Sequence, residues 1–597
     1  MRKIISISLL LTVMISVSAV KVQPGLTVIY QKDGTQLTIS GYGDDKMHYY
    51  LTRDKVLLFH YLTDYYIAKI ESDGTLSSTG ILAHEADNRT DEEKEAVAAQ
   101  DKDVFYNAIS ANVAQSKAGY AREAVSNLST LFPHTGSPTA LVILVNFQDS
   151  VFKEADPKSV FDKYLNAESF DSEKDGTLAY NSGSVRKYFT DISKGLFTPQ
   201  FDVHGPVTLP NKLAYYGGSD DNGDDENMTG LIKDACNAMN DSLNFSLYDE
   251  NKDEYVDLLY IIYAGYSQSF NGVSTNAIWP KSGTVNVGPY DGVKICRYGV
   301  SNEIYGAPEN NIKEILINGI GLFCHEFSHC LGLPDFYPTS SYAQNNNNPA
   351  LEYWDLMDAG EYTNKGYTPN EYSAWEKEAM GWIKIDTLKT AANVTLTPLN
   401  AGGAAYRIMN DNDATGHEYY IVENVQKTGW NSGLLGHGML IYHVDYDADA
   451  FSLNSNSVNN TVGHSRMTIF PADGLLISSY DNSYTDNEYL ESHAGDPFPG
   501  TSNTTSFTDT TSIVKSVVYT GSTGFMSKPI TKIAEAADGT ITFKFMGGSA
   551  TGIDTAITDN RQKEDNRIYS INGMYMGTDM DTLPKGLYIR NGRKIIK

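Results

Sequence analysis

The pattern of hydrophobic and polar positions changes several times along the 597-residue chain, and each change predicts a different unit. Residues 20–135 begin with short alternating segments that are broken by KDGT and SDGT, and a polar helical period follows from about residue 89. The alternation predicts a small β-rich unit. LFPHTGSPTA then interrupts the pattern with Pro, Gly and Ser, a composition typical of a linker or a cleavage region.

Residues 136–385 predict a mixed α/β domain. ALVILVNFQD is apolar enough to be a buried central strand, and YVDLLYIIYAGY predicts a second strand. SVRKYFTDIS and IKEILINGIGLFC favour helices, the latter a buried one. NEYSAWEKEAMGWI is amphipathic, because helical spacing places these residues on one face: Tyr372, Trp375, Ala379 and Trp382.

The remainder of the chain is dominated by strand patterns. Residues 386–547 contain strand-length segments separated by Gly, Asn and Asp turns, which predict a β-sandwich. Residues 548–566 form a polar linker, and residues 567–597 contain Asn-Gly turn signals at Asn572 and Asn591. We therefore expect a multidomain α+β protein that ends in a small β-rich unit.

The N-terminus and the charge indicate where the protein acts. In residues 1–19, Arg2 and Lys3 precede an apolar run that ends in small residues, which predicts a secretory signal peptide cut near Ala19. No later apolar run approaches the roughly 18 residues that a transmembrane segment needs. The formal charge of −28 repels phosphate backbones, so nucleic acid is not an expected partner, whereas cations such as calcium are.

Four cysteines in an exported chain permit two disulfides, with no connectivity readable from the sequence. Cys324 and Cys330 should point to different faces of a helix and so not pair with each other. No cysteine precedes Cys236, which excludes a cysteine-dependent block of the active site by the N-terminal unit. A direct block must then use a carboxylate, a histidine or a backbone carbonyl.

The motif with the clearest chemistry is HEFSH, within GLFCHEFSHCLGLPDFY. On a helix, His325 and His329 lie one turn apart on the same face, so both imidazoles can reach one zinc ion at about 2.0–2.1 Å. Glu326 can sit beside such an ion without binding it. From there it can act as the general base that takes a proton from an attacking water.

The third zinc ligand has two possible sources. Gly332 can take the positive φ that ends a helix, and Asp335 follows His329 by six residues, where the long zinc-peptidase motif holds its third ligand. Aspartate is a competent oxygen donor to zinc. A thermolysin-like arrangement would instead use a later glutamate, Glu352 or Glu371. The spacing favours Asp335.

HEFSHCLGLPD, followed by YWDLMDAG, resembles the metzincin-like secreted metallopeptidases of the immune inhibitor A family. ALVILVNFQD, SVRKYFTDISKGLFTPQFDVHGPVTLP, YDENKDEYVDLLYIIYAG, SAWEKEAMGWI and LIYHVD resemble family segments in the same order. The resemblance implies a propeptide over 20–135, a metzincin-like zinc peptidase domain over 136–385 and a β-sandwich behind it. It also implies that Met357 is the methionine of the Met-turn beneath the zinc. Taken alone, Met357 would be read as ordinary core packing.

A second set of oxygen donors lies in YDENKDEYVD. Asp249, Asn251, Asp253, the Tyr255 carbonyl and Asp257 alternate as in the first part of a calcium loop, which suggests calcium as a second cofactor. A glutamate replaces the glycine that such loops use. An acidic turn before a strand explains the pattern equally well.

These features predict a secreted zinc endopeptidase that cleaves protein or peptide substrates, although no specificity pocket can be read from the sequence. A cell-surface binding or adhesin protein with a degenerate peptidase fold is the alternative, and the intact Glu326 speaks against it.

The last residues of the chain carry a second resemblance. RIYSINGMYMG…LPKGLYIRNGRKIIK resembles the C-terminal sorting domains of Bacteroidetes cargo for the type nine secretion system. The resemblance implies a secretion machinery as partner and export across the outer membrane to the surface or medium. A small cap that stabilises the sandwich is the alternative.

Overall fold

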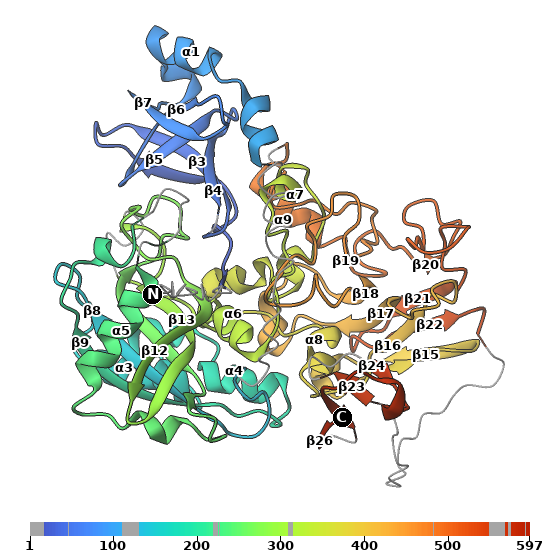
Figure 1. Cartoon of the computed structure of the whole chain (residues 1–597). Helices are drawn as coiled ribbons and strands as arrows, with labels where there is room; N and C mark the ends of the chain where they lie inside the picture. The colour runs from blue at the N-terminus through green and yellow to red at the C-terminus, as the bar shows by residue number, and fades with distance from the viewer. Residues whose placement is uncertain are drawn as a thin grey trace, which may run out of the picture.

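The computed structural model describes residues 17–597 except 46, 110–130, 219–224, 226, 309–314, 482, 549–567, 571–574 and 591–592. Figure 1 shows an N-terminal sheet above a mixed sheet-and-helix unit, two further sheets beside that unit, and a small C-terminal sheet. The combination of mixed and antiparallel sheets with helices confirms a multidomain α+β chain.

The N-terminal unit is a six-stranded antiparallel meander with a short helix against it. Its alternating residues bury one face, which includes Leu37, Ile39 and Tyr65. A capping box between Thr90 and Glu93 begins the helix, and residues 102–109 are helical again. The elements in sheet order are β2 (Thr27–Tyr30), β3 (Gln36–Gly43), β4 (His48–Thr52), β5 (Leu57–Tyr61), β6 (Asp64–Ile70) and β7 (Leu76–Leu82), with α1 (Asp91–Ala98).

The second unit contains the central sheet, in the order β1-β12-β13-β11-β8-β9, with β10 beside β13. Strands β9, β8, β11 and β13 are parallel, whereas β12 is antiparallel to β13 and β1 to β12. The strands are β1 (Val17–Ala19), β8 (Thr139–Asn146), β9 (Gln200–Thr208), β10 (Tyr255–Val256), β11 (Leu259–Tyr266), β12 (Lys281–Tyr290) and β13 (Val293–Ile304).

Helices cover both faces of this sheet, as parallel strands require. Along β8, Val142 and Leu144 pack towards α3, α4 and α6, while Leu141 and Ile143 pack towards α5 on the opposite face. This alternation explains why the strand is apolar throughout. The helices are α3 (Pro157–Asn166), α4 (Val185–Ile192), α5 (Met228–Met239), α6 (Ile320–Leu331), α7 (Ser341–Asn345) and α8 (Ala374–Ala379).

One predicted helix is wrong in part. IKEILINGIGLFC was expected to be helical throughout, but α6 begins only at Ile320. Ile317 forms a β-bridge with Ile304, so the chain before the helix is extended. Gly319, the extended N-cap, lies so close to Gly366 that an added Cβ would be 2.3 Å from its carbonyl carbon. Tertiary contact therefore overrides the helical pattern there.

The third unit consists of two sheets around one core, in the manner of a sandwich. Strand β17 is buried on both faces: Tyr420 and Val422 enter the core between the two sheets, whereas Tyr419 and Ile421 join the core around α6. The predicted boundary at residue 385 thus crosses a shared hydrophobic core. One sheet has β14 (Asp386–Thr387), β16 (Tyr406–Met409), β17 (Glu418–Val425), β18 (Gly438–Asp445) and β19 (Met467–Ile469); the other has β15 (Ala392–Leu396), β22 (Ile541–Phe545), β21 (Ile530–Glu535) and β20 (Ser506–Phe507), and α9 spans Asp486–His493.

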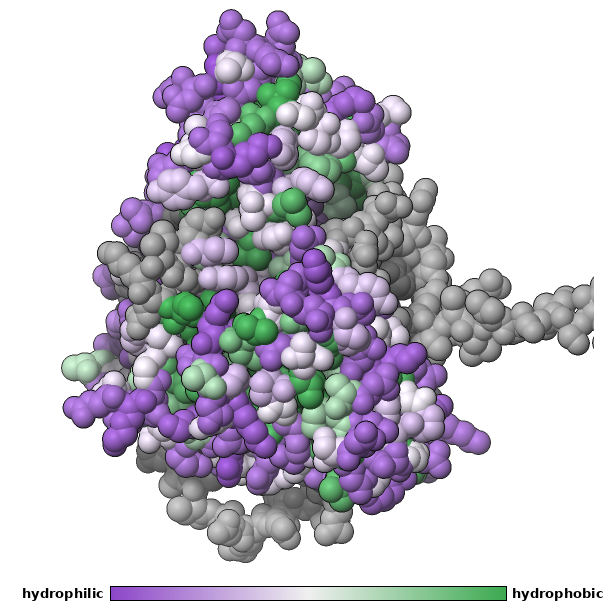
Figure 2. Space-filling view, turned by 90° about the vertical axis from the view of Figure 1, so that its left-hand side faces the viewer, coloured by the Kyte–Doolittle hydropathy of each residue, from purple (hydrophilic) through white to green (hydrophobic). Residues whose placement is uncertain are grey.

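The chain ends in a four-stranded antiparallel sheet in the order β24-β23-β25-β26. Its strands are β23 (Ile568–Ser570), β24 (Tyr575–Gly577), β25 (Leu587–Arg590) and β26 (Arg593–Ile596). The predicted linker lies outside the described residues, apart from Gly548. Within the described part of the chain, no helix has both the length and the apolarity to cross a membrane. On the face seen in Figure 2, hydrophobic residues occur in small groups among hydrophilic ones.

Candidate metal centre

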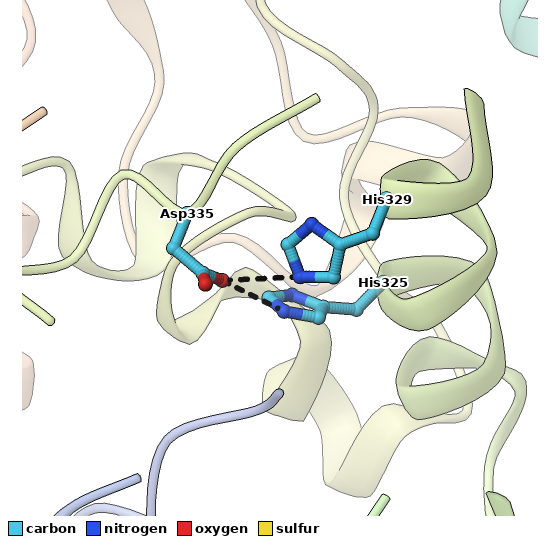
Figure 3. A group of neighbouring side chains, drawn as sticks. All are labelled: His325, His329 and Asp335. Atoms are coloured by element: carbon cyan, nitrogen blue, oxygen red, sulfur yellow. Dashed lines mark ion pairs between the residues drawn. The ribbon is translucent and has the colours of Figure 1, made fainter. Parts of the chain in front are cut away.

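Helix α6 presents both histidines of the motif to one loop. The helix is buried along its whole length, and it ends at Gly332, whose φ of 112° turns the chain back towards the same face. As Figure 3 shows, His325 and His329 extend from adjacent turns towards Asp335. The turn that the sequence predicts at Gly332 is therefore confirmed.

The three side chains converge on one point. Asp335 Oδ1 lies 3.1 Å from His325 Nε2 and 3.3 Å from His329 Nε2. The opposite ring nitrogens are held by backbone carbonyls: His325 Nδ1 is 2.9 Å from the Leu356 oxygen, and His329 Nδ1 is 2.7 Å from the Leu333 oxygen. Each Nδ1–H can thus donate to a carbonyl, which leaves Nε2 free to bind a metal.

The residues present fit a zinc ion. The two Nε2 atoms and Asp335 Oδ1 are buried, and none of them makes a hydrogen bond within the described residues. Such atoms are costly unless a ligand satisfies them. Among the described residues, these three form the only cluster of His, Cys, Asp or Glu that could hold a metal ion. Two imidazoles and a carboxylate are a donor set typical of catalytic zinc.

The protonation states agree with metal binding. Burial, with the neighbouring His329, lowers the pKa of His325 despite the opposing effect of Asp335. Burial acts to raise the pKa of Asp335, but the two histidines outweigh it and lower that pKa below its ordinary value. A neutral imidazole and an ionised carboxylate are the forms that bind metals.

Glu326 lies beside this centre and is completely buried. Burial, and next the charge of Asp335, raise its pKa well above the ordinary value. Its Oε1 accepts a hydrogen bond of 3.0 Å from the backbone N–H of Val20, whereas Oε2 has no hydrogen bond within the described residues. One oxygen of the Glu326 side chain is therefore unpaired within the described residues, and the other is contacted by the N-terminal segment of the same chain.

Several neighbours of the centre were not found by sequence reasoning. Asn456, on a loop between β18 and β19, accepts a hydrogen bond of 2.7 Å from the Asp335 N–H and donates one of 2.5 Å to Asp335 Oδ2. Tyr337 donates its hydroxyl hydrogen to the Ala19 carbonyl. Trp279 donates to the Val20 carbonyl at 2.8 Å. Asn456 and the N-terminal segment are more than 100 residues from the motif, so no local spacing could have indicated them.

The other predicted site residues are placed as follows. Met357 is buried directly after Leu356, whose carbonyl holds His325, and its own carbonyl accepts from Phe336 at 2.8 Å. Glu371 pairs with Lys377 at 2.5 Å, and Glu352 contacts Ser479, Tyr489 and Lys21. Neither glutamate belongs to the metal-binding cluster in the described residues.

The proposed calcium loop is closed by its own hydrogen bonds. Asp249 accepts from the N–H groups of Asp253 and Glu254, at 3.0 and 3.2 Å. Asp257 accepts from the Glu250 N–H at 3.0 Å and from the Asn251 amide at 3.1 Å. These contacts suit an acidic turn before β10 and give calcium no support.

All four cysteines are free thiols. Cys324 and Cys330 lie on α6 and are completely buried, and Cys330 Sγ is 3.3 Å from Ser282 Oγ. The two disulfides that the composition permits are not formed.

The molecule has a sheet flanked by helices, and two buried histidines and a buried aspartate lie beside a glutamate. This arrangement is typical of metal-dependent hydrolases. Residues 134–385 match the model of the immune inhibitor A peptidase M6 catalytic domain. The match supports a zinc metallopeptidase domain in this part of the chain.

Two relatives agree with this assignment. The chain is 29% identical over 282 residues to Immune inhibitor A of Bacillus thuringiensis subsp. alesti, which covers 40% of this chain and 39% of that protein. It is 28% identical over 226 residues to Pre-pro-metalloprotease PrtV of Vibrio cholerae serotype O1 (strain M66-2), which covers 34% of this chain and 24% of that protein. The matches thus span less than half of either relative.

Proposed function

We propose that the protein is a secreted zinc-dependent endopeptidase that hydrolyses protein substrates, with His325, His329 and Asp335 as zinc ligands. The observation that carries the proposal is the convergence of three buried ligand atoms, none hydrogen-bonded within the described residues, beside a buried glutamate. When bound there, zinc would polarise the scissile carbonyl and acidify the attacking water.

The chain's own residues supply the proton transfers. Glu326 accepts the proton of the attacking water and delivers it to the leaving amine, a role that its unpaired Oε2 and its contact with a backbone nitrogen support. Tyr337, whose hydroxyl donates to the Ala19 carbonyl of this chain, would donate in the same way to the scissile carbonyl as negative charge develops on it. Burial raises the pKa of Tyr337 well above its usual range, so the hydroxyl remains a donor.

Residues 20–135 are proposed to be a propeptide that keeps the precursor inactive. Val20 and Lys21 are buried against the catalytic unit, with the Val20 N–H on Glu326. Lys281 of the catalytic unit forms a buried ion pair of 3.0 Å with Asp45 of the N-terminal unit. The sequence led us to expect a carboxylate, histidine or carbonyl that blocks the metal. The contact with Glu326 involves a backbone N–H, and the block of the metal itself stays a prediction.

The ends of the chain are proposed to direct its export. Residues 1–19 would act as the signal peptide, and residues 567–597 as the C-terminal domain recognised by an outer-membrane secretion machinery. The four-stranded sheet after residue 567 is compatible with a separately recognised unit, although a stabilising role would suit it as well.

The decisive experiment combines zinc analysis of the processed protein with casein hydrolysis, with and without a chelator. Bound zinc and chelator-sensitive hydrolysis are expected. Glu326→Gln should retain zinc, because its side chain is not a ligand, yet lose nearly all hydrolysis. Zinc without cleavage of any protein or peptide would favour the binding or adhesin alternative, and full activity in Glu326→Gln would refute the proposed base.

A further inference from the structure

The N-terminal segment crosses the catalytic site as an extended peptide. Strand β1 pairs antiparallel with β12, with Ala19 opposite Lys281, and it adds to what is otherwise the edge of the central sheet. Trp279 donates to the Val20 carbonyl at 2.8 Å. In Figure 1 the N-terminal chain, coloured blue, descends from its own sheet to the region of α6. Strand addition at a sheet edge is a common mode of peptide binding.

The contacts of this segment identify one peptide bond, between Ala19 and Val20. The same bond ends the proposed signal peptide, so in the exported precursor Val20 would be the first residue and Lys21 the second. The nitrogen of Val20 lies 3.0 Å from Glu326 Oε1, and the carbonyl of Ala19 accepts from Tyr337. In peptide hydrolysis the base returns its proton to the leaving nitrogen, so Val20 N lies in the place of that atom. Lys21 is then the second residue beyond the bond that would be cut.

The side chain of Lys21 fills a buried acidic pocket. Its Nζ lies 2.6 Å from Asp358 Oδ1 and 4.0 Å from Glu352 Oε2, and all three side chains are at most 1% exposed. The ring centroids of Tyr337 and Tyr480 lie 5.6 and 5.5 Å from the same nitrogen. Carboxylates and aromatic faces together are suited to a cation.

The pocket is built independently of Lys21. Asp358 Oδ2 accepts from the N–H groups of Leu351 and Glu352, at 3.0 and 2.6 Å. Glu352 Oε2 accepts from the Ser479 N–H and the Tyr489 hydroxyl, while its buried Oε1 has no hydrogen bond within the described residues. Glu352 also has a φ of 53°, a costly conformation for this residue. Both carboxylates are thus held in place around a position for a cation.

We propose that this pocket is the substrate subsite for a lysine or arginine side chain two residues beyond the scissile bond, an inference that rests on the proposed peptidase function. Lys21 occupies the subsite in the precursor. When the propeptide leaves, two buried carboxylates remain without a cation, since no other ion pair to them occurs in the described residues. A basic substrate side chain restores the pairing, whereas an acidic one is repelled.

The test uses the processed, zinc-loaded enzyme and a series of quenched fluorescent peptides that differ only at this position, with Lys, Arg, Met or Glu. Mass spectrometry locates the cut. We expect kcat/KM for Lys to exceed that for Met by about 30-fold or more, and Glu to be the poorest. Asp358→Asn and Glu352→Gln should each lose most of the preference for Lys over Met. Glu491→Gln, an exposed change on α9 near Tyr489, should keep it.

The possible results distinguish a failure of the proposed subsite from a failure of the proposed peptidase function. Equal rates for Lys, Met and Glu in the unmodified enzyme would overturn the subsite and leave the peptidase function intact. A preference for Lys at another position relative to the cut would also overturn it. Failure to cleave any peptide or casein would overturn the subsite together with the proposed function. If a variant does not fold, the peptide series with the unmodified enzyme still decides.

Discussion

Asn456 should strengthen zinc binding although it supplies no ligand atom. It holds Asp335 by two hydrogen bonds, of 2.7 and 2.5 Å. Asp335 is 0% exposed and Asn456 is 4% exposed, so water does not readily replace these bonds. Asn456 has a φ of 43°, which glycine tolerates without strain. Asn456→Gly therefore removes both bonds while it spares the backbone.

The size of the effect follows from the contact with a charged ligand. A hydrogen bond to a charged group is worth about 1.5–3 kcal/mol, and partners of metal ligands typically change metal affinity by about 10–100-fold. We expect the Kd for zinc of the processed enzyme to rise within that range, as measured by competition with a chromophoric chelator. The two estimates agree, since about 1.4 kcal/mol corresponds to tenfold.

A matched control lies on the same loop. Asn460 contacts Thr339 and the Ser340 N–H, both at 2.9 Å, and so joins the same two segments without touching Asp335. Asn460→Ala should leave the zinc Kd unchanged. If Asn456→Gly binds zinc as tightly as the unmodified enzyme, Asp335 does not depend on this support and the reasoning is refuted.

Four further results are expected. Asp335→Ala should lower zinc affinity in the same chelator assay and Glu371→Ala should not; the reverse would assign the third ligand to Glu371. In the precursor that retains its propeptide, Lys21→Met leaves buried carboxylates without a cation, which costs about 3–5 kcal/mol. Residual peptidase activity should therefore rise on the order of 10²–10³-fold. If the Lys21→Met precursor is as inactive as the unmodified precursor, Lys21 does not help to hold the propeptide against the catalytic unit. Burial lowers the pKa of His84, but hydrogen bonds to two carboxylates outweigh burial and raise this pKa above its ordinary value. The ion pairs of His84 therefore stabilise the folded unit below about pH 6.5, and this stabilisation is lost as pH rises through the pKa of the folded state. The thermal midpoint of the precursor's N-terminal unit should fall between about pH 6 and 8, and His84→Gln should remove that dependence. Deletion of 567–597 should leave activity in the extract while protein accumulates in the periplasm, and normal levels in the medium would argue against the sorting role.

Much of the fold follows from local pattern. The apolar run at β8 becomes a strand buried on both faces because helices cover both sides of a parallel sheet. The pattern failed before Ile320, where pairing of Ile317 with Ile304 and the close approach of Gly319 to Gly366 keep the chain extended. Apolar composition alone does not distinguish a helix from such a segment.

The candidate site divides in the same way. Helix geometry alone places His325 and His329 on one face, and Gly332, three residues after His329, ends the helix through its positive φ. The local sequence is therefore enough to predict where two candidate ligands lie and which aspartate could approach them. Tertiary structure decided the remainder. Asn456 comes from the loop between β18 and β19, and Lys21 comes from the start of the chain. Contacts between segments more than 100 residues apart depend on how whole units pack, and no local period encodes them.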